Sequence, residues 1–134
     1  MVIFLDTSFL YALAVRGDAN HERAKELFSR ALSENSDLVT HNLIVLESAA
    51  LLQRRHGRAA ASALIKDCRK FRTIMIDEQL HELVTARFVR SGKRRLSMAD
   101  LFSFAVMKRE GIKNALAFDD DFEDEGFRLW GGED

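Results

Sequence analysis

Four acidic residues of this chain have the type and spacing to build an active site: Asp6, Glu47, Asp100 and Asp119. Two of them directly follow short apolar segments, one interrupts a largely apolar stretch, and one lies three residues after a serine. A carboxylate is costly to remove from water without a cation or hydrogen-bond donor beside it. Oxygen ligands without nitrogen or sulfur suit a hard divalent ion. The pattern therefore predicts a Mg²⁺ or Mn²⁺ site, provided that the fold brings the four acids together.

The rest of the chain predicts a fold that could do this. Short apolar runs alternate with longer amphipathic segments, a pattern typical of a parallel sheet covered by helices. We expect one α/β domain over residues 1–134, a three-layer α/β/α sandwich with a short, mainly parallel sheet of four to five strands. The expected strands are Val2–Leu5, Asp37–Thr40, Thr73–Ile76, Ala115–Phe118 and, more weakly, Arg128–Trp130.

Helices are expected between these strands, each with a recognisable capping residue. Asp18 or Asn20 starts one that continues to about residue 32, and Asn42 starts one over residues 43–56. Others cover residues 58–70, follow Asp77, and run from Ser97 to before residue 111.

Ligands of open parallel sheets bind beyond the carboxyl ends of the strands. Asp6 and Asp119 end strands at that edge, and Asp100 lies in the first turn of a helix that enters from it. Glu47 lies in a helix so apolar that it should be buried over most of its circumference, which would turn the carboxylate toward the cleft.

Each acid also has a structural interpretation. Asp6 could cap a helix that begins near Ser8, and Ser97-x-x-Asp100 resembles a capping box. Glu47 could belong to a solvent-exposed polar stripe, and residues 119–121 could be an acidic loop kept for solubility. Asp121 is a candidate accessory ligand, whereas Asp120 should face water. Thr7, Ser8 and Ser97 are hydroxyls placed to orient the acids.

The charge distribution favours a polyanionic substrate. The net charge is −1, but residues 54–95 carry twelve Lys and Arg against four Asp and Glu. A basic segment between acidic flanks is expected when metal-binding acids act on nucleic acid, although solvated helix faces would give the same count.

Cysteine, histidine and apolar segments restrict the other classes. Cys68 is the only cysteine, which fits a reducing cytoplasm, and its apolar neighbours indicate a packed thiol rather than a nucleophile. The four histidines show no zinc-binding spacing and are interpreted as surface or capping residues. No stretch approaches the ~20 apolar residues of a membrane span.

Taken in order, these motifs resemble the PIN domain, and the chain is similar to the VapC toxins of toxin–antitoxin pairs. The resemblance rests on Asp6-Thr7-Ser8 after a strand, on Glu47, on Ser97-x-x-Asp100 and on Phe118-Asp119-x-Asp121-Phe122. It covers essentially the whole chain, from Val2 to about Trp130. Ala117 departs from the pattern, because many relatives carry Thr or Ser there.

The resemblance implies a Rossmann-like sandwich and a Mg²⁺- or Mn²⁺-dependent endoribonuclease that cuts tRNA, rRNA or mRNA. It implies that Asp6, Glu47, Asp100 and Asp119 form the acidic site, with Asp121 accessory and Asp6 and Asp100 the most direct metal ligands. It also implies a homodimer in the cytoplasm, silenced by a small antitoxin. The candidate RNA-binding residues are Arg54, Arg55, Lys93, Arg94 and Arg95.

Two other classes remain as alternatives. The first is a PIN-like module that holds RNA or a protein and has little or no catalysis. The second is a phosphatase or receiver domain with Asp6 as phosphoryl acceptor. The phosphatase pattern would want an Asp where Ser8 stands, and the receiver pattern would want a lysine that the Phe118–Phe122 turn does not contain.

Overall fold

The structure, a computed structural model, describes residues 1–91 and 96–132. Within them, five parallel strands form one sheet in the order β3-β2-β1-β4-β5. The strands are β1 (Val2–Leu5), β2 (Asp37–His41), β3 (Arg72–Ile74), β4 (Asn114–Leu116) and β5 (Arg128–Leu129). The predicted α/β class and the parallel sheet are confirmed.

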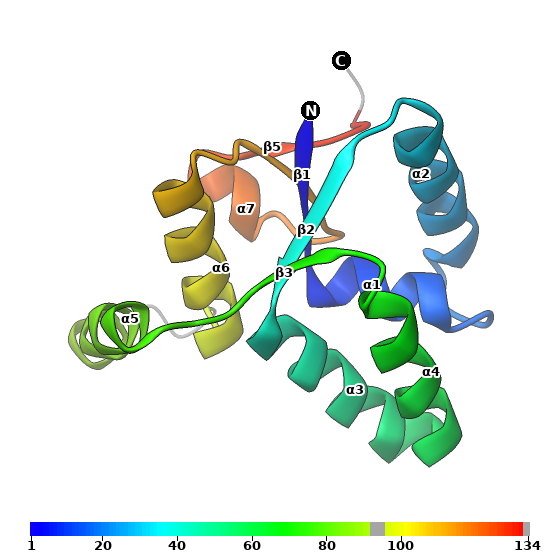
Figure 1. The fold of residues 1–134 in the computed structure, drawn as a ribbon, viewed down its shortest axis with the longest axis horizontal. Helices are drawn as coiled ribbons and strands as arrows, with labels where there is room; N and C mark the ends of the chain where they lie inside the picture. Colours follow the sequence, from blue (N-terminus) through cyan, green and yellow to red (C-terminus); the bar gives the residue numbers. More distant parts are fainter. Residues whose placement is uncertain (92–95, 133–134) are drawn as a thin grey trace.

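Helices cover both faces of the sheet. They are α1 (Thr7–Ala14), α2 (His21–Ser33), α3 (Asn42–His56), α4 (Arg58–Cys68), α5 (Glu78–Arg90), α6 (Met98–Glu110) and the short α7 (Asp121–Asp124). Figure 1 shows α1, α2 and α4 on one side of the sheet and α5, α6 and α7 on the other. The three layers follow from the alternation of strands and helices along the chain.

The core is centred on β1, whose residues Ile3, Phe4 and Leu5 are fully buried. A strand buried on both faces needs a continuous apolar run, which is what the sequence provides. Behind it, Phe104 of α6 meets Phe122 of α7 edge to face, with ring centroids 5.0 Å apart. Phe122 also contacts Phe4 of β1, with ring centroids 6.3 Å apart. This packing therefore joins β1, which Asp6 follows, to α6, which carries Asp100.

Two strands end earlier than the apolar pattern predicts, because side chains capture their last backbone groups. The predicted strand at residues 73–76 ends at 74, since the Ile76 N–H donates to Asn42 Oδ1 at 2.7 Å. The strand predicted at 115–118 ends at 116, since the Phe118 N–H donates to Ser8 Oγ at 3.0 Å. Asn42 is therefore not the cap of α3, a role that His41 takes.

The expectation that α3 is buried over most of its circumference is wrong. Its buried residues are Ile44, Ser48, Ala49 and Leu52, whereas Leu46 is 58% exposed and Glu47 is exposed as well. The reason is placement: α3 leaves the carboxyl edge of the sheet and contacts α1, α4 and α6 instead of lying flat on a sheet face (Figure 1).

The expectation that Cys68 is packed holds. Cys68 is buried, and burial together with the charge of Asp67 raises the pKa of its thiol to about 11, as expected for a packed rather than a reactive cysteine. In the described ranges no helix is long and apolar enough to cross a membrane.

Candidate active site

Asp6 stands at the carboxyl end of β1, where it both caps α1 and faces the predicted site. Its side chain is 3% exposed, and its Oδ2 accepts hydrogen bonds from the Ser8 N–H at 3.2 Å and the Ser8 Oγ–H at 2.8 Å. The capping interpretation is thus correct. It leaves the second carboxylate oxygen, Oδ1, available for another partner.

The electrostatics of Asp6 indicate that this partner is a cation. Burial raises the pKa of Asp6 to about 7, and the negative charges of Asp119 and Asp100 add to the effect, whereas the Ser8 hydrogen bonds oppose it. No Lys, Arg or His of the described residues forms an ion pair with Asp6. Among these residues, the Ser8 hydrogen bonds are what stabilises its charged form.

Asp100 and Asp119 lie close enough for electrostatic interactions: the charge of Asp119 raises the pKa of Asp100, and both charges raise the pKa of Asp6. The capping box is present: the Asp100 N–H donates to Ser97 Oγ at 3.0 Å, and the Ser97 N–H donates to Asp100 Oδ2 at 3.3 Å. Asp119 Oδ1 accepts from the Asp121 N–H at 3.1 Å. Burial raises the pKa of both carboxyl groups, and the charge of Asp121 raises each further. Asp120 is exposed, as expected.

Glu47 is the member of the predicted quartet that stands apart. It is exposed on α3, and its charge is not among those that raise the pKa of Asp6. It is nevertheless tied to the site, because the Thr7 Oγ1–H donates to Glu47 Oε1 at 2.6 Å. Glu47 therefore lies at the rim of the acidic site, connected to it through Thr7, the residue that follows Asp6.

Three hydrogen bonds fix the backbone immediately before each of the three gathered acids. They run from Thr40 Oγ1 to Leu5 O at 2.9 Å, from Ser103 Oγ to Ala99 O at 2.9 Å, and from Phe118 N to Ser8 Oγ at 3.0 Å. Ser8 thus forms hydrogen bonds both with Asp6 and with the segment that carries Asp119. In that segment Ala117 has no hydroxyl of its own. Sequence reasoning found Ser8 but missed Thr40 and Ser103.

A buried histidine supports one of these contacts. His41 Nδ1 accepts from the Ile44 N–H at 3.2 Å, so its other ring nitrogen, Nε2, carries the proton and donates to Ser103 Oγ at 3.0 Å. Burial lowers the pKa of His41 to about 4, which keeps the ring neutral. The prediction of a capping role is correct for His41, but it is no surface residue. A polar Thr-His pair ending an apolar strand was the available signal.

The donor set fits a hard divalent ion in its chemistry, because it consists of carboxylates that raise one another's pKa. Yet in residues 1–91 and 96–132 no group of three or more His, Cys, Asp or Glu side chains stands ready to hold a metal. The two observations agree if the acids interact at longer range than a coordination sphere. Asp100 and Asp119, like Asp6, each accept a local backbone N–H on one carboxylate oxygen.

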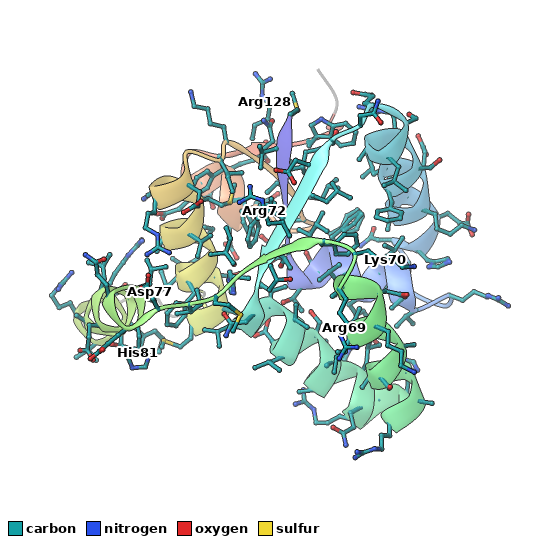
Figure 2. The ribbon with its side chains drawn as sticks, viewed as in Figure 1. Arg69, Lys70, Arg72, Asp77, His81 and Arg128 are labelled. Atoms are coloured by element: carbon teal, nitrogen blue, oxygen red, sulfur yellow. The ribbon has the colours of Figure 1, made fainter. Side chains whose placement is uncertain are left out.

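Some of the basic residues in the described part of segment 54–95 form ion pairs with acids of other segments. Arg72 pairs with Asp37 at 3.2 Å and Arg87 with Glu125 at 3.1 Å, so part of the charge is neutralised within the chain. Figure 2 shows Arg69, Lys70 and Arg72 at separate places between the end of α4 and the start of β3. Arg54 and Arg55 lie in the last turn of α3. Of the predicted RNA-binding residues, Lys93, Arg94 and Arg95 lie outside the described residues.

An acidic cluster at the carboxyl edge of a parallel α/β/α sheet defines the class. The chain belongs to the PIN domain family, whose profile matches residues 3–127. It is 41% identical over 128 residues to the 23S rRNA-specific endonuclease VapC20 of Mycobacterium tuberculosis, in both strain CDC 1551 and strain H37Rv. The match covers 94% of this chain and 95% of the relative.

A solved structure agrees. The crystal structure of Mycobacterium tuberculosis VapC20, described as a sarcin-ricin loop cleaving toxin, superposes with a TM-score of 0.82 and 39% identity. The similarity covers 93% of this chain and 95% of that one. The resemblance to VapC-type PIN proteins is therefore confirmed.

Proposed function

We propose that this protein is the endoribonuclease toxin of a type II toxin–antitoxin pair, that it depends on Mg²⁺ or Mn²⁺, and that it cleaves 23S rRNA in the sarcin-ricin loop. One observation carries the proposal: Asp6 is buried beside Asp100 and Asp119, with no ion pair to a cation among residues 1–91 and 96–132. The substrate is taken from the names of the VapC20 relatives.

In this proposal Asp6, Asp100 and Asp119 hold the ion, with Asp121 and Glu47 accessory. A divalent ion, when bound, polarises water for attack on phosphorus and offsets charge on the phosphate and the leaving oxygen. Ser8 orients Asp6 through its two donated hydrogen bonds, and Ser97 orients Asp100. Thr7 holds Glu47 at the rim of the site.

The test is cleavage of a 23S rRNA fragment that contains the sarcin-ricin loop. We expect the wild type to cut in Mg²⁺ or Mn²⁺ and to stop in EDTA. Asp6→Asn and Asp100→Asn should each lower the rate by about 1,000-fold or more, because each removes a carboxylate that would hold the ion, and the ion would offset the negative charge developing on the phosphate. Asp18→Asn, an exchange of the same kind far from the site, is the matched control.

Retained metal-dependent cleavage by either active-site variant, with a native circular dichroism spectrum, would refute the assigned roles. The alternative is a PIN-like module that holds RNA or a protein without cutting. It predicts RNA binding by the wild type and no EDTA-sensitive cleavage of any ribosomal RNA.

Partners follow from the same proposal. We expect a homodimer in the cytoplasm, where ribosomal RNA is found, and a small antitoxin that blocks the acidic site. Light scattering on the eluting protein measures the oligomeric state. Co-expression tests toxicity: wild type should arrest growth and Asp6→Ala should not.

A further inference from the structure

Beyond the acidic site, α1 and α3 run side by side and meet in a second polar contact. Tyr11 lies one turn after Thr7 on α1, and Arg55 and His56 lie in the last turn of α3, about 12 Å along the helix axis from Glu47. The Arg55 Nη1–H donates to Tyr11 Oη at 3.3 Å, and His56 Nε2 is 3.2 Å from the same oxygen. The Arg55 guanidinium carbon lies 5.5 Å from the Tyr11 ring centroid.

The charge of Arg55 is left uncompensated. Arg72, Arg87 and Arg109 each pair with a carboxylate of another element. Arg55 forms no ion pair within residues 1–91 and 96–132, where its partner is an aromatic ring and a phenol oxygen. Cations in a last helical turn favour the helix dipole, which explains a charge at this position. That effect does not explain why the guanidinium is held by a tyrosine from α1.

We propose that Tyr11, Arg55 and His56 form a subsite for an RNA phosphate near the cleaved bond, with Arg55 as the phosphate-binding group and Tyr11 as a positioning residue. This inference rests on the proposed nuclease function. A guanidinium offers paired N–H donors that match phosphate oxygens, and stacking on a ring pre-organises it. Tyr11 Oη restrains both basic side chains, so the donors stay directed to one place.

The negative charge of the acidic site explains why a cationic subsite is needed nearby. The acidic site repels a polyanion, so the strand needs cations close by to be held while an ion occupies the acids. Thr7 and Tyr11 lie on one face of α1, so the subsite begins one helical turn from the residue that holds Glu47. A strand that crosses α1 and α3 would therefore pass over the rim of the acidic site.

The experiment measures RNA binding without cleavage. The protein is the Asp6→Asn variant in EDTA, and the probe is a fluorescein-labelled RNA hairpin with the sarcin-ricin loop sequence, titrated between about 50 and 200 mM salt. Adding Arg55→Gln should weaken binding about tenfold and reduce the slope of log K against log salt by about one. Arg128→Gln is the matched control.

Arg128 suits that purpose because it is exposed and pairs with Asn114 at the start of β4, the opposite edge of the sheet (Figure 2). Its loss should leave affinity and slope unchanged. Equal effects of Arg55→Gln and Arg128→Gln would overturn the subsite, and so would a parent protein with no measurable RNA binding.

Tyr11→Phe separates positioning from packing. It keeps the ring and every charge, so we expect about threefold weaker binding with an unchanged salt slope. In the cleaving protein it should raise KM and leave kcat nearly unchanged, and Arg55→Lys should keep the salt slope. A lower melting temperature with unaltered RNA affinity would mean that the cluster only joins two helices. Binding is measured on an inactive variant, so the result does not depend on cleavage. A failure of the nuclease proposal would instead appear in the cleavage assay of the wild type.

Discussion

Two carboxylates of this fold, one buried and one partly buried, lie in opposite electrostatic environments. Glu125 accepts hydrogen bonds from Arg87 at 3.1 and 3.3 Å and from Lys108 at 3.0 Å. Burial acts to raise the pKa of Glu125, but those two cations lower it on balance. Asp6 is more deeply buried and has no such cation among the described residues, and its pKa is raised. A carboxylate that joins elements is neutralised by cations of its own chain. The candidate catalytic carboxylate has no such partner in the described part of the chain, as our proposal of an external ion expects.

The contrast predicts opposite responses to pH. The folded-state pKa of Asp6 lies above its unfolded value, so the folded protein holds a proton that the unfolded chain loses, and stability from this group falls as pH rises from about 4 to about 7. The folded-state pKa of Glu125 is lowered, so its contribution is present above the unfolded value of 4.5 and is lost as pH falls.

The largest expected effect is therefore that Asp6→Asn stabilises the metal-free protein above pH 7. Removing the buried charge should raise the free energy of unfolding by roughly 2–4 kcal/mol at pH 8, with little change at pH 4. Urea unfolding in EDTA at both pH values measures it. Asp120→Asn, at an exposed neighbour, should stay within about 0.5 kcal/mol of wild type.

Divalent ions sharpen the same comparison. Mg²⁺ or Mn²⁺ should stabilise the wild type at pH 8 and leave Asp6→Asn almost unaffected, because a ligand stabilises only the state that binds it. An Asp6→Asn protein that is less stable than wild type at pH 8 in EDTA would break the contrast with Glu125.

Glu125→Gln should change the free energy of unfolding in the opposite direction to Asp6→Asn, and by a smaller amount. It removes one charge from a pair of hydrogen-bonded cations, which should lower the free energy of unfolding by about 1–3 kcal/mol at pH 7. Arg87 and Lys108 are partly exposed and remain solvated, which limits the loss. RNA cleavage at a temperature where the variant is folded should match wild type. A loss of cleavage without a loss of stability would assign Glu125 a functional role.

Thr7→Val should have the smallest effect on the fold and still test Glu47. The lost hydrogen bond to Glu47 is exposed, so stability should change by less than about 1 kcal/mol. Cleavage should fall by about tenfold, as is usual when a group that orients a ligand is removed. Thr7→Ser keeps the hydroxyl and should retain activity. Full activity of Thr7→Val would leave Glu47 outside the mechanism.

Much of this architecture could be predicted from the sequence, because it depends on residues that are only a few positions apart. Apolar runs of strand length specified β1 and β4, and the residues after them are necessarily at the carboxyl edge. The capping box at Ser97 and Asp100 is likewise local, since its partners are three residues apart. Strand ends were less predictable, because Asn42 and Ser8 capture backbone groups that are distant in sequence.

The sequence by itself predicted the alternation of strands and longer helices and the parallel sheet, and it singled out the candidate acids, because propensity, capping and burial on both faces act over a few residues. It did not predict the short helix α7. Only the tertiary structure decided that Asp6, Asp100 and Asp119 gather while Glu47 stays at the rim. It alone placed His41 and Ser103 behind Asp100, and Tyr11 against Arg55. These relations depend on the angles and distances at which helices cross. Packing between residues as far as about a hundred positions apart in the sequence determines them.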